Sequence, residues 1–138
     1  MNDVWATPQA LFNRLNAQHH FTCDVCALPD NAKVSQYFSP EQDGLKQEWH
    51  GVCWCNPPYG RAITAWVKKA LLSVTIGEAE KVVMLLPAKT DTKWFHEYIL
   101  PFGSIEFIKG RLRFGEAKHN AMFPSMIVVF ERRNHDGR

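Results

Sequence analysis

Apolar residues recur along the chain in two rhythms, which predict alternating helices and strands. Between residues 61 and 76 they fall three or four positions apart, which is helical spacing with one apolar face. Residues 81–86 form a nearly continuous apolar run, which is typical of a buried parallel strand. Strands that alternate with helices imply an α/β fold with a mixed, mostly parallel sheet and helices on its faces. Shorter apolar runs predict further strands at 21–27, 52–56, 104–108 and 126–130.

Two further helices are predicted from boundary residues. Thr7-Pro8 precedes a helical pattern at 9–15, which places Thr7 at the N-cap and Pro8 at the first helical position. A second short helix is predicted at 92–100, where Pro101 stops it.

The remaining segments lack a regular period. Residues 28–44 carry several turn-forming residues and predict a long, weakly ordered connection with a short strand at 37–38. Residues 109–119 predict a loop or hairpin, and 134–138 a frayed tail. No internal repeat occurs in the 138 residues, so we expect a single domain over residues 1–133.

The most informative sequence is the turn Asn56-Pro57-Pro58-Tyr59, which follows the predicted strand at 52–56. Two consecutive prolines cannot continue a central strand, because neither has an N–H for the hydrogen-bond ladder. The strand therefore ends here and presents Asn56 and Tyr59 at its carboxyl end, the edge of an open α/β sheet where ligands bind. A short amide, two rigid prolines and an aromatic ring predict a site for a flat, hydrogen-bonding group such as a nucleobase.

Composition sets the cellular context. The apolar content of 46% is that of an ordinary globular protein. No apolar stretch approaches the roughly 18 residues that a membrane span needs, and no signal peptide precedes the first predicted helix. We therefore expect a cytoplasmic protein that does not contact a membrane. Nothing in the sequence predicts an oligomeric state.

Charge is unevenly distributed, although the net charge is only +2. Residues 1–80 hold 6 Lys/Arg and 8 Asp/Glu, a net charge of −2, whereas residues 81–138 hold 10 and 6, a net charge of +4. The split fits either random surface variation or a phosphate-contacting surface in the C-terminal half. A charged, solvated edge strand is the alternative for the 109–114 segment. The candidate phosphate-contacting residues are Arg61, Lys89, Arg111, Arg113 and Lys118.

Four cysteines, Cys23, Cys26, Cys53 and Cys55, have a spacing that a four-sulfur zinc site could use. Cys53 and Cys55 alternate along a predicted strand and should share one face, whereas Cys23 and Cys26 should not. We therefore expect no metal and interpret the thiols as small buried hydrophobic groups.

Six short segments occur in a fixed order over most of the chain. They are Trp5-Ala6-Thr7-Pro8, Asp24-Val25-Cys26-Ala27, Asp43-Gly44-Leu45, Cys55-Asn56-Pro57-Pro58-Tyr59-Gly60, Leu86-Pro87-Ala88 and Gly110-Arg111-Leu112-Arg113-Phe114. The ordered set resembles the small phage-type DNA N6-adenine methyltransferases, the Dam-like family of phages and prophages. The resemblance implies a reduced Rossmann-like methyltransferase fold, S-adenosylmethionine as cofactor, double-stranded DNA as substrate and the bacterial host cytoplasm as location.

The resemblance also implies roles for individual residues. The Asn56 side-chain carbonyl and the Pro57 backbone carbonyl would accept the two N6 hydrogens of an adenine flipped out of the duplex. Pro58 would help to fix the backbone, and Tyr59 would stack on the base. The implied cofactor-binding residues are Trp5, Thr7, Pro8, Asp24, Cys26, Ala27 and Asp43.

Two other functions stay open at this stage. No glycine-rich loop follows Asp24, which departs from the commoner methyltransferase pattern and leaves room for a catalytically decayed nucleic-acid-binding protein. The Asn56–Tyr59 tetrapeptide also occurs in methyltransferases that modify RNA or a protein glutamine.

Overall fold

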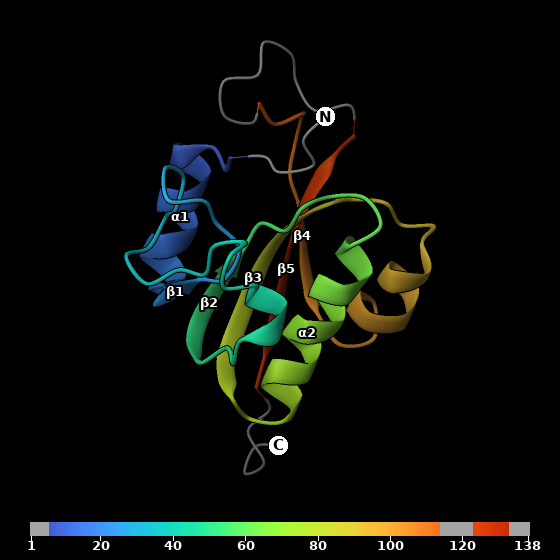
Figure 1. Cartoon of the computed structure of the whole chain (residues 1–138). Helices are drawn as coiled ribbons and strands as arrows, with labels where there is room; N and C mark the ends of the chain where they lie inside the picture. The colour runs from blue at the N-terminus through green and yellow to red at the C-terminus, as the bar shows by residue number, and fades with distance from the viewer. Residues whose placement is uncertain (1–5, 114–122, 133–138) are drawn as a thin grey trace.

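A computed structural model describes residues 6–113 and 123–132, which form a five-stranded sheet flanked by helices (Figure 1). The order of strands across the sheet is β1-β2-β3-β5-β4. β1, β2 and β3 pair in parallel, whereas β5 is antiparallel to both β3 and β4, so β5 alone runs against the other four. The strands are β1 (Cys23–Asp24), β2 (Gly51–Cys55), β3 (Ala79–Pro87), β4 (Ser104–Phe107) and β5 (Ser125–Glu131).

The two faces of the sheet bury different side chains, because successive residues of a strand point to opposite sides. Trp54 and Val52 of β2 pack with helix α1 (Gln9–His19), whereas Cys53 and Cys55 pack with helix α2 (Ile63–Thr75). In Figure 1 the helix α2 lies in front of the sheet. The helices therefore cover opposite faces, and both ends of β2 are held between them.

The helix at 61–76 and the strand at 81–86 are confirmed, with α2 at Ile63–Thr75 and β3 at Ala79–Pro87. The predicted cap of the first helix is wrong. Pro8 is the N-cap of α1, and no side chain makes a capping hydrogen bond there. Thr7 thus lies one residue outside the helix.

The short helix predicted at 92–100 is shorter than expected, and its hydrogen bonds are those of a π-helix. Its core is η2 (Phe95–Ile99), a π-helical turn in which the Leu100 N–H donates to the Phe95 carbonyl oxygen at 2.8 Å. The Thr92 hydroxyl accepts from the Phe95 N–H at 3.2 Å and supports its start.

The long connection between β1 and β2 has little regular structure, as expected. It contributes one parallel bridge, between Asp24 and Tyr37, and the short 3₁₀ helix η1 (Gly44–Lys46). The bridge adds a minimal strand beside β1, so the sheet is a trimmed version of an α/β sheet. In the part of the chain that the structure describes, no helix has the length and apolar character to cross a membrane. The predicted frayed tail at 134–138 lies outside the described residues.

Candidate active site

The parallel strands place the catalytic candidates at one edge of the sheet. Asp24 pairs with Trp54 in the register of β1 and β2, and Asn56 follows Trp54 by two residues. Both carboxyl ends therefore meet, which is where open α/β sheets bind ligands. The turn after β2 is mostly buried: Asn56, Pro57 and Tyr59 are buried and Pro58 is half-buried.

The Asn56 side chain has a defined orientation. Its Nδ2 donates a hydrogen bond to the Thr7 hydroxyl Oγ1 at 2.9 Å, and the two side chains are 6% and 5% exposed. The hydroxyl thus belongs to the site, although it does not cap α1.

Asp24 holds a carboxylate that water barely reaches, since the residue is only 2% exposed. Its Oδ1 accepts from the Cys26 N–H at 3.3 Å and its Oδ2 from the Lys33 N–H at 3.0 Å. Burial raises the pKa of Asp24 to about 6, against the opposing effect of these two hydrogen bonds. The Lys33 ammonium group donates to Gln9 Oε1 at 2.7 Å. Among the described residues no salt bridge to Asp24 occurs.

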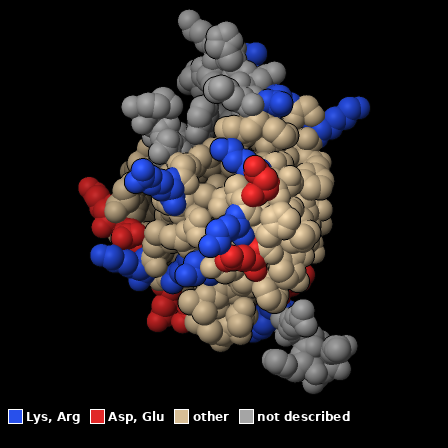
Figure 2. Space-filling model, turned by 90° about the vertical axis from the view of Figure 1, so that its right-hand side faces the viewer, with Lys and Arg blue, Asp and Glu red and all other residues tan. Residues whose placement is uncertain are grey.

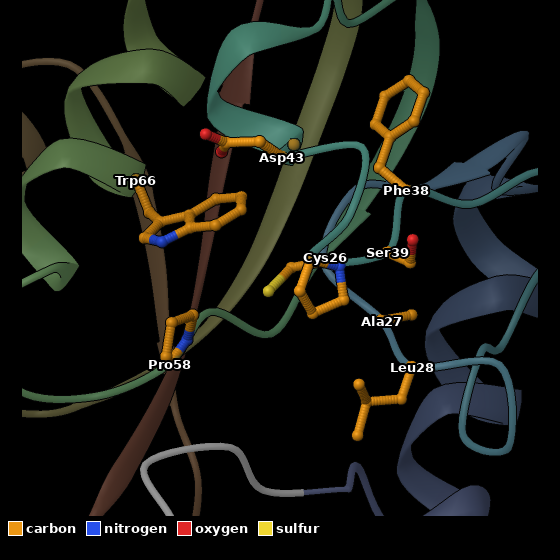
Figure 3. A pocket seen from close by; sticks show the side chains of 10 residues that line it. Cys26, Ala27, Leu28, Phe38, Ser39, Asp43, Pro58 and Trp66 are labelled. Carbon is orange, nitrogen blue, oxygen red and sulfur yellow. The ribbon is translucent and has the colours of Figure 1, made fainter.

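Two cavities lie beside the turn. The first has a volume of about 10 Å³ and polar walls that include Thr7, Asp24 and Asn56. The second has about 230 Å³ and mostly apolar walls. Figure 3 shows the side chains around it, with Trp66 from α2 and Pro58 from the turn. The walls of the larger cavity are Cys26, Ala27, Leu28, Phe38, Ser39, Pro40, Asp43, Gly44, Pro58 and Trp66.

Asp43 lies at the larger cavity because of the glycine that follows it. A Cβ atom at position 44 would overlap the Val25 carbonyl oxygen and touch the Trp66 ring at 3.0 Å. Glycine thus allows the turn to pack against the end of β1 and against α2. The Asp43 carboxylate accepts from the Leu45 N–H at 3.2 Å, so it caps η1 and lines the cavity at once.

The expected cofactor residues divide into three groups. Asp24, Cys26, Ala27 and Asp43 line one or both cavities, as does Thr7. Cys26 lines both cavities. Pro8 is the N-cap of α1 and lines neither cavity, and Trp5 lies outside the described residues.

The Tyr59 ring is packed rather than open. It is 7% exposed, and its centroid lies 5.4 Å from that of Phe123 in an edge-on contact. Burial raises the pKa of Tyr59, so the phenol is neutral. The Lys89 ammonium group lies 5.5 Å from the Phe123 ring centroid, which brings a cation to the mouth of the turn.

The candidate DNA contacts lie on exposed segments. Arg61 follows the turn, and Arg111 and Arg113 are exposed while Leu112 packs against the core. The described part of 109–114 is not a strand, and within it only Leu112 is partly buried. The Ile108 N–H donates to Ser125, so this segment starts at the same end of β5 as the turn. Lys118 lies outside the described residues.

The four thiols share one core cluster, so the expectation that Cys23 and Cys26 face apart is wrong. The chain bends after the two-residue β1, which returns Cys26 to that side. Burial raises the pKa of Cys23 to about 11 and of Cys26 and Cys53 to about 12. Neutral thiols are poor metal ligands. In the ranges 6–113 and 123–132 no cluster of three or more His, Cys, Asp or Glu residues could hold a metal ion.

Several wall residues were not expected from the sequence. Leu28, Ser39 and Pro40 come from the connection after β1, and all three line the larger cavity. The predicted strand at 37–38 was the available signal, because the residues after it had to reach the same sheet edge as Asp24.

Comparisons with known proteins identify the family of the chain. A family model described as DNA N-6-adenine-methyltransferase (Dam) matches residues 1–136. The DNA N-6-adenine-methyltransferase of Haemophilus phage HP1 (strain HP1c1) is 35% identical over an alignment of 138 positions. The alignment covers 94% of this chain and 79% of the relative. The protein of the same name from Escherichia phage T1 is 32% identical over 100 residues, covering 70% of this chain and 41% of the relative.

A solved structure supports the fold. The crystal structure of the 23S rRNA methyltransferase ErmE superposes with a TM-score of 0.60 over 94% of this chain and 70% of ErmE, at 15% sequence identity. The expected Rossmann-like methyltransferase fold is thereby confirmed. On its sequence match, this chain belongs to the DNA N-6-adenine-methyltransferase (Dam) family.

Proposed function

We propose that this chain transfers a methyl group from S-adenosylmethionine to the N6 amino group of adenine in double-stranded DNA, and that the reaction takes place at Asn56–Tyr59. The observation that carries the proposal is the buried Asn56 amide, held by Thr7 at the same sheet edge as the buried Asp24 carboxylate. This arrangement offers hydrogen-bond acceptors for an amino group beside a site for a cation.

The two cavities beside the turn mark where the cofactor would lie, with its adenine end at the larger one and its methionine end beside Asp24. Apolar walls in the larger cavity suit the adenine ring, and the Asp43 carboxylate at its side suits ribose hydroxyls. Asp24 has no salt-bridge partner among the described residues, so it suits the positively charged methionine end. When bound, the cofactor supplies an electrophilic methyl group on a sulfonium. Cys26 and Ala27 would support it through the wall that they already form.

Asn56 and Pro57 perform the chemical task of the protein. The lone pair of an adenine amino nitrogen is delocalised into the ring, which makes it a weak nucleophile. Two carbonyl acceptors on its hydrogens, Asn56 Oδ1 and the Pro57 oxygen, localise the lone pair and stabilise the positive charge that develops on nitrogen. The two prolines restrict the backbone, so the acceptors are already in place before the base arrives.

The base must leave the duplex to reach this turn. A base that stacks on Tyr59 would lie beside Phe123, whose ring already contacts that of Tyr59 edge-on. Arg61, Lys89, Arg111 and Arg113 are exposed and would contact phosphates. The face in Figure 2 carries basic and acidic groups side by side, so we expect local phosphate contacts rather than one broad basic field.

Asn56→Ala tests this role directly. The variant should fold and bind S-adenosylmethionine, yet lose on the order of 100-fold or more in methyl-transfer rate, because one preorganised acceptor is gone. Transfer of labelled methyl to DNA gives the rate, and calorimetry gives the cofactor affinity. Asn13→Ala, an exposed asparagine on α1, is the matched control and should keep the wild-type rate. An equal rate in Asn56→Ala and wild type would refute the proposed site.

A further inference from the structure

Thr7 has a hydroxyl that its own helix does not use. A threonine ahead of a proline normally accepts a backbone N–H and caps the helix. Here Pro8 is the N-cap of α1, and no side-chain capping bond forms. The Thr7 hydroxyl is nevertheless buried, and it bonds to Asn56, 49 residues further along the chain. A buried hydroxyl directed at a distant residue indicates a task other than helix capping.

In the structure the Asn56 amide presents its Nδ2 to the Thr7 hydroxyl. An asparagine side chain offers one acceptor and two donors, and only the acceptor can take an N6 hydrogen. Since Nδ2 donates to Thr7 Oγ1, Oδ1 lies at the other branch of the amide. Both residues are nearly inaccessible to water, so water competes little with Thr7 as the partner of Nδ2.

Packing of α1 fixes Thr7 in space. Phe12 of this helix is 3% exposed, and its ring meets that of Trp54 edge-on, with centroids 5.5 Å apart. Trp54 lies two residues before Asn56 on β2. Through this contact, the helix that follows Thr7 is held against the strand that carries Asn56.

We propose that Thr7 is a positioning residue that holds the Asn56 amide with its carbonyl oxygen toward the target amino group. The inference rests on the proposed function of Asn56. It assigns Thr7 a role different from the cofactor contact that the sequence suggested. A positioning role predicts a loss of rate at unchanged cofactor affinity, whereas a direct cofactor contact predicts the reverse.

Three variants test the proposal. Thr7→Val removes the hydroxyl at similar volume and should lower the single-turnover methyl-transfer rate about tenfold, the loss expected for one buried hydrogen bond. Thr7→Ser keeps the hydroxyl and should restore the rate to within about threefold of wild type. Thr22→Val is the matched control. The Thr22 hydroxyl bonds to Val52 at the opposite end of the sheet, so its loss should leave the rate per folded molecule unchanged.

Calorimetry and a double variant separate the possible roles. The dissociation constant for S-adenosylmethionine should be the same within about twofold in Thr7→Val and wild type, because Thr7 acts on Asn56. In an Asn56→Ala background, Thr7→Val should cause no further loss of rate, since the residue through which it acts is gone. NMR should show faster exchange of the Asn56 side-chain amide hydrogens in Thr7→Val.

The outcomes distinguish this inference from the proposed function. An inactive wild type would overturn both. An active wild type with an unchanged rate in Thr7→Val would overturn the positioning role alone. Weaker cofactor binding in Thr7→Val, with an unchanged rate at saturation, would instead assign Thr7 to the cofactor. If Thr7→Val lowered the methyl-transfer rate as much in the Asn56→Ala background as in the wild type, the proposal would also be contradicted.

Discussion

Burial of the Asp24 carboxylate is energetically unfavourable, which indicates that this side chain has a role in binding a ligand. A carboxylate removed from water favours its neutral form, which is why the pKa of Asp24 rises to about 6 although two backbone N–H groups donate to it. The Lys33 ammonium group donates to Gln9, and its charge opposes the rise in the pKa of Asp24 without forming a salt bridge with it. A site that keeps an ionisable carboxyl without a salt bridge is prepared for a ligand that brings its own positive charge.

The pH dependence of cofactor binding follows from this carboxyl. Below about pH 6 the free protein carries a protonated Asp24, and a cationic ligand must displace that proton. The affinity for S-adenosylmethionine should therefore be constant above pH 6 and fall by up to tenfold per pH unit below it. Calorimetry at pH 7, 6 and 5 measures this.

Two carboxylate variants control that experiment. Asp24→Asn should bind weakly with a flat dependence on pH, because the titrating group is absent. Asp43→Asn removes a carboxylate from the larger cavity and should keep the steep fall. An affinity that does not change from pH 7 to 5 in the wild type would remove Asp24 from the cofactor site.

Among the helices and strands, those defined by a local sequence pattern were predicted correctly. Two prolines end β2, and one apolar face defines α2, so both were placed correctly. The α1 cap was wrong because the Thr7 hydroxyl bonds to a residue 49 positions away, which local spacing cannot reveal. The larger cavity was missed for a similar reason. Most of its walls come from a connection with little regular structure, whose path is fixed by one bridge at Tyr37 and a close approach at Gly44.

The segment around Arg111 and Arg113 makes a prediction of its own. Both side chains are exposed, and Leu112 between them anchors the backbone in the core. If they contact phosphates, replacing both by alanine should weaken binding to any DNA sequence. It should also flatten the salt dependence of the affinity by about one to two units of slope, because fewer counterions are released. A salt titration of DNA affinity gives the slope.

Lys68→Ala/Arg132→Ala is the matched control, with the same loss of two charges. Lys68 lies on α2, and Arg132 follows β5 at the end of the sheet away from the turn. This variant should keep the wild-type slope. Identical slopes in all three proteins would refute phosphate contacts by Arg111 and Arg113, and the DNA surface would then be sought around Arg61 and Lys89.

In the molecule as a whole, the order and direction of the strands bring the site residues together. Asp24, Asn56 and Lys89 follow or end three adjacent parallel strands, and β5 starts at the same edge because it runs the opposite way. Helices α1 and α2 then close the two faces, one with Thr7 at its start and the other with Trp66 on the larger cavity. Among the described residues, the sheet edge thus brings together the Asn56–Tyr59 turn and the two cavities beside it.

The most direct measurement is the identity of the methylated product. The purified protein is incubated with S-adenosylmethionine labelled in its methyl group and with unmethylated double-stranded DNA, after which the DNA is hydrolysed to nucleosides and separated. The account predicts label in N6-methyl-2′-deoxyadenosine, and its loss in Asn56→Ala. Label in a cytosine nucleoside, or no transfer to DNA by a folded protein that binds the cofactor, would contradict it.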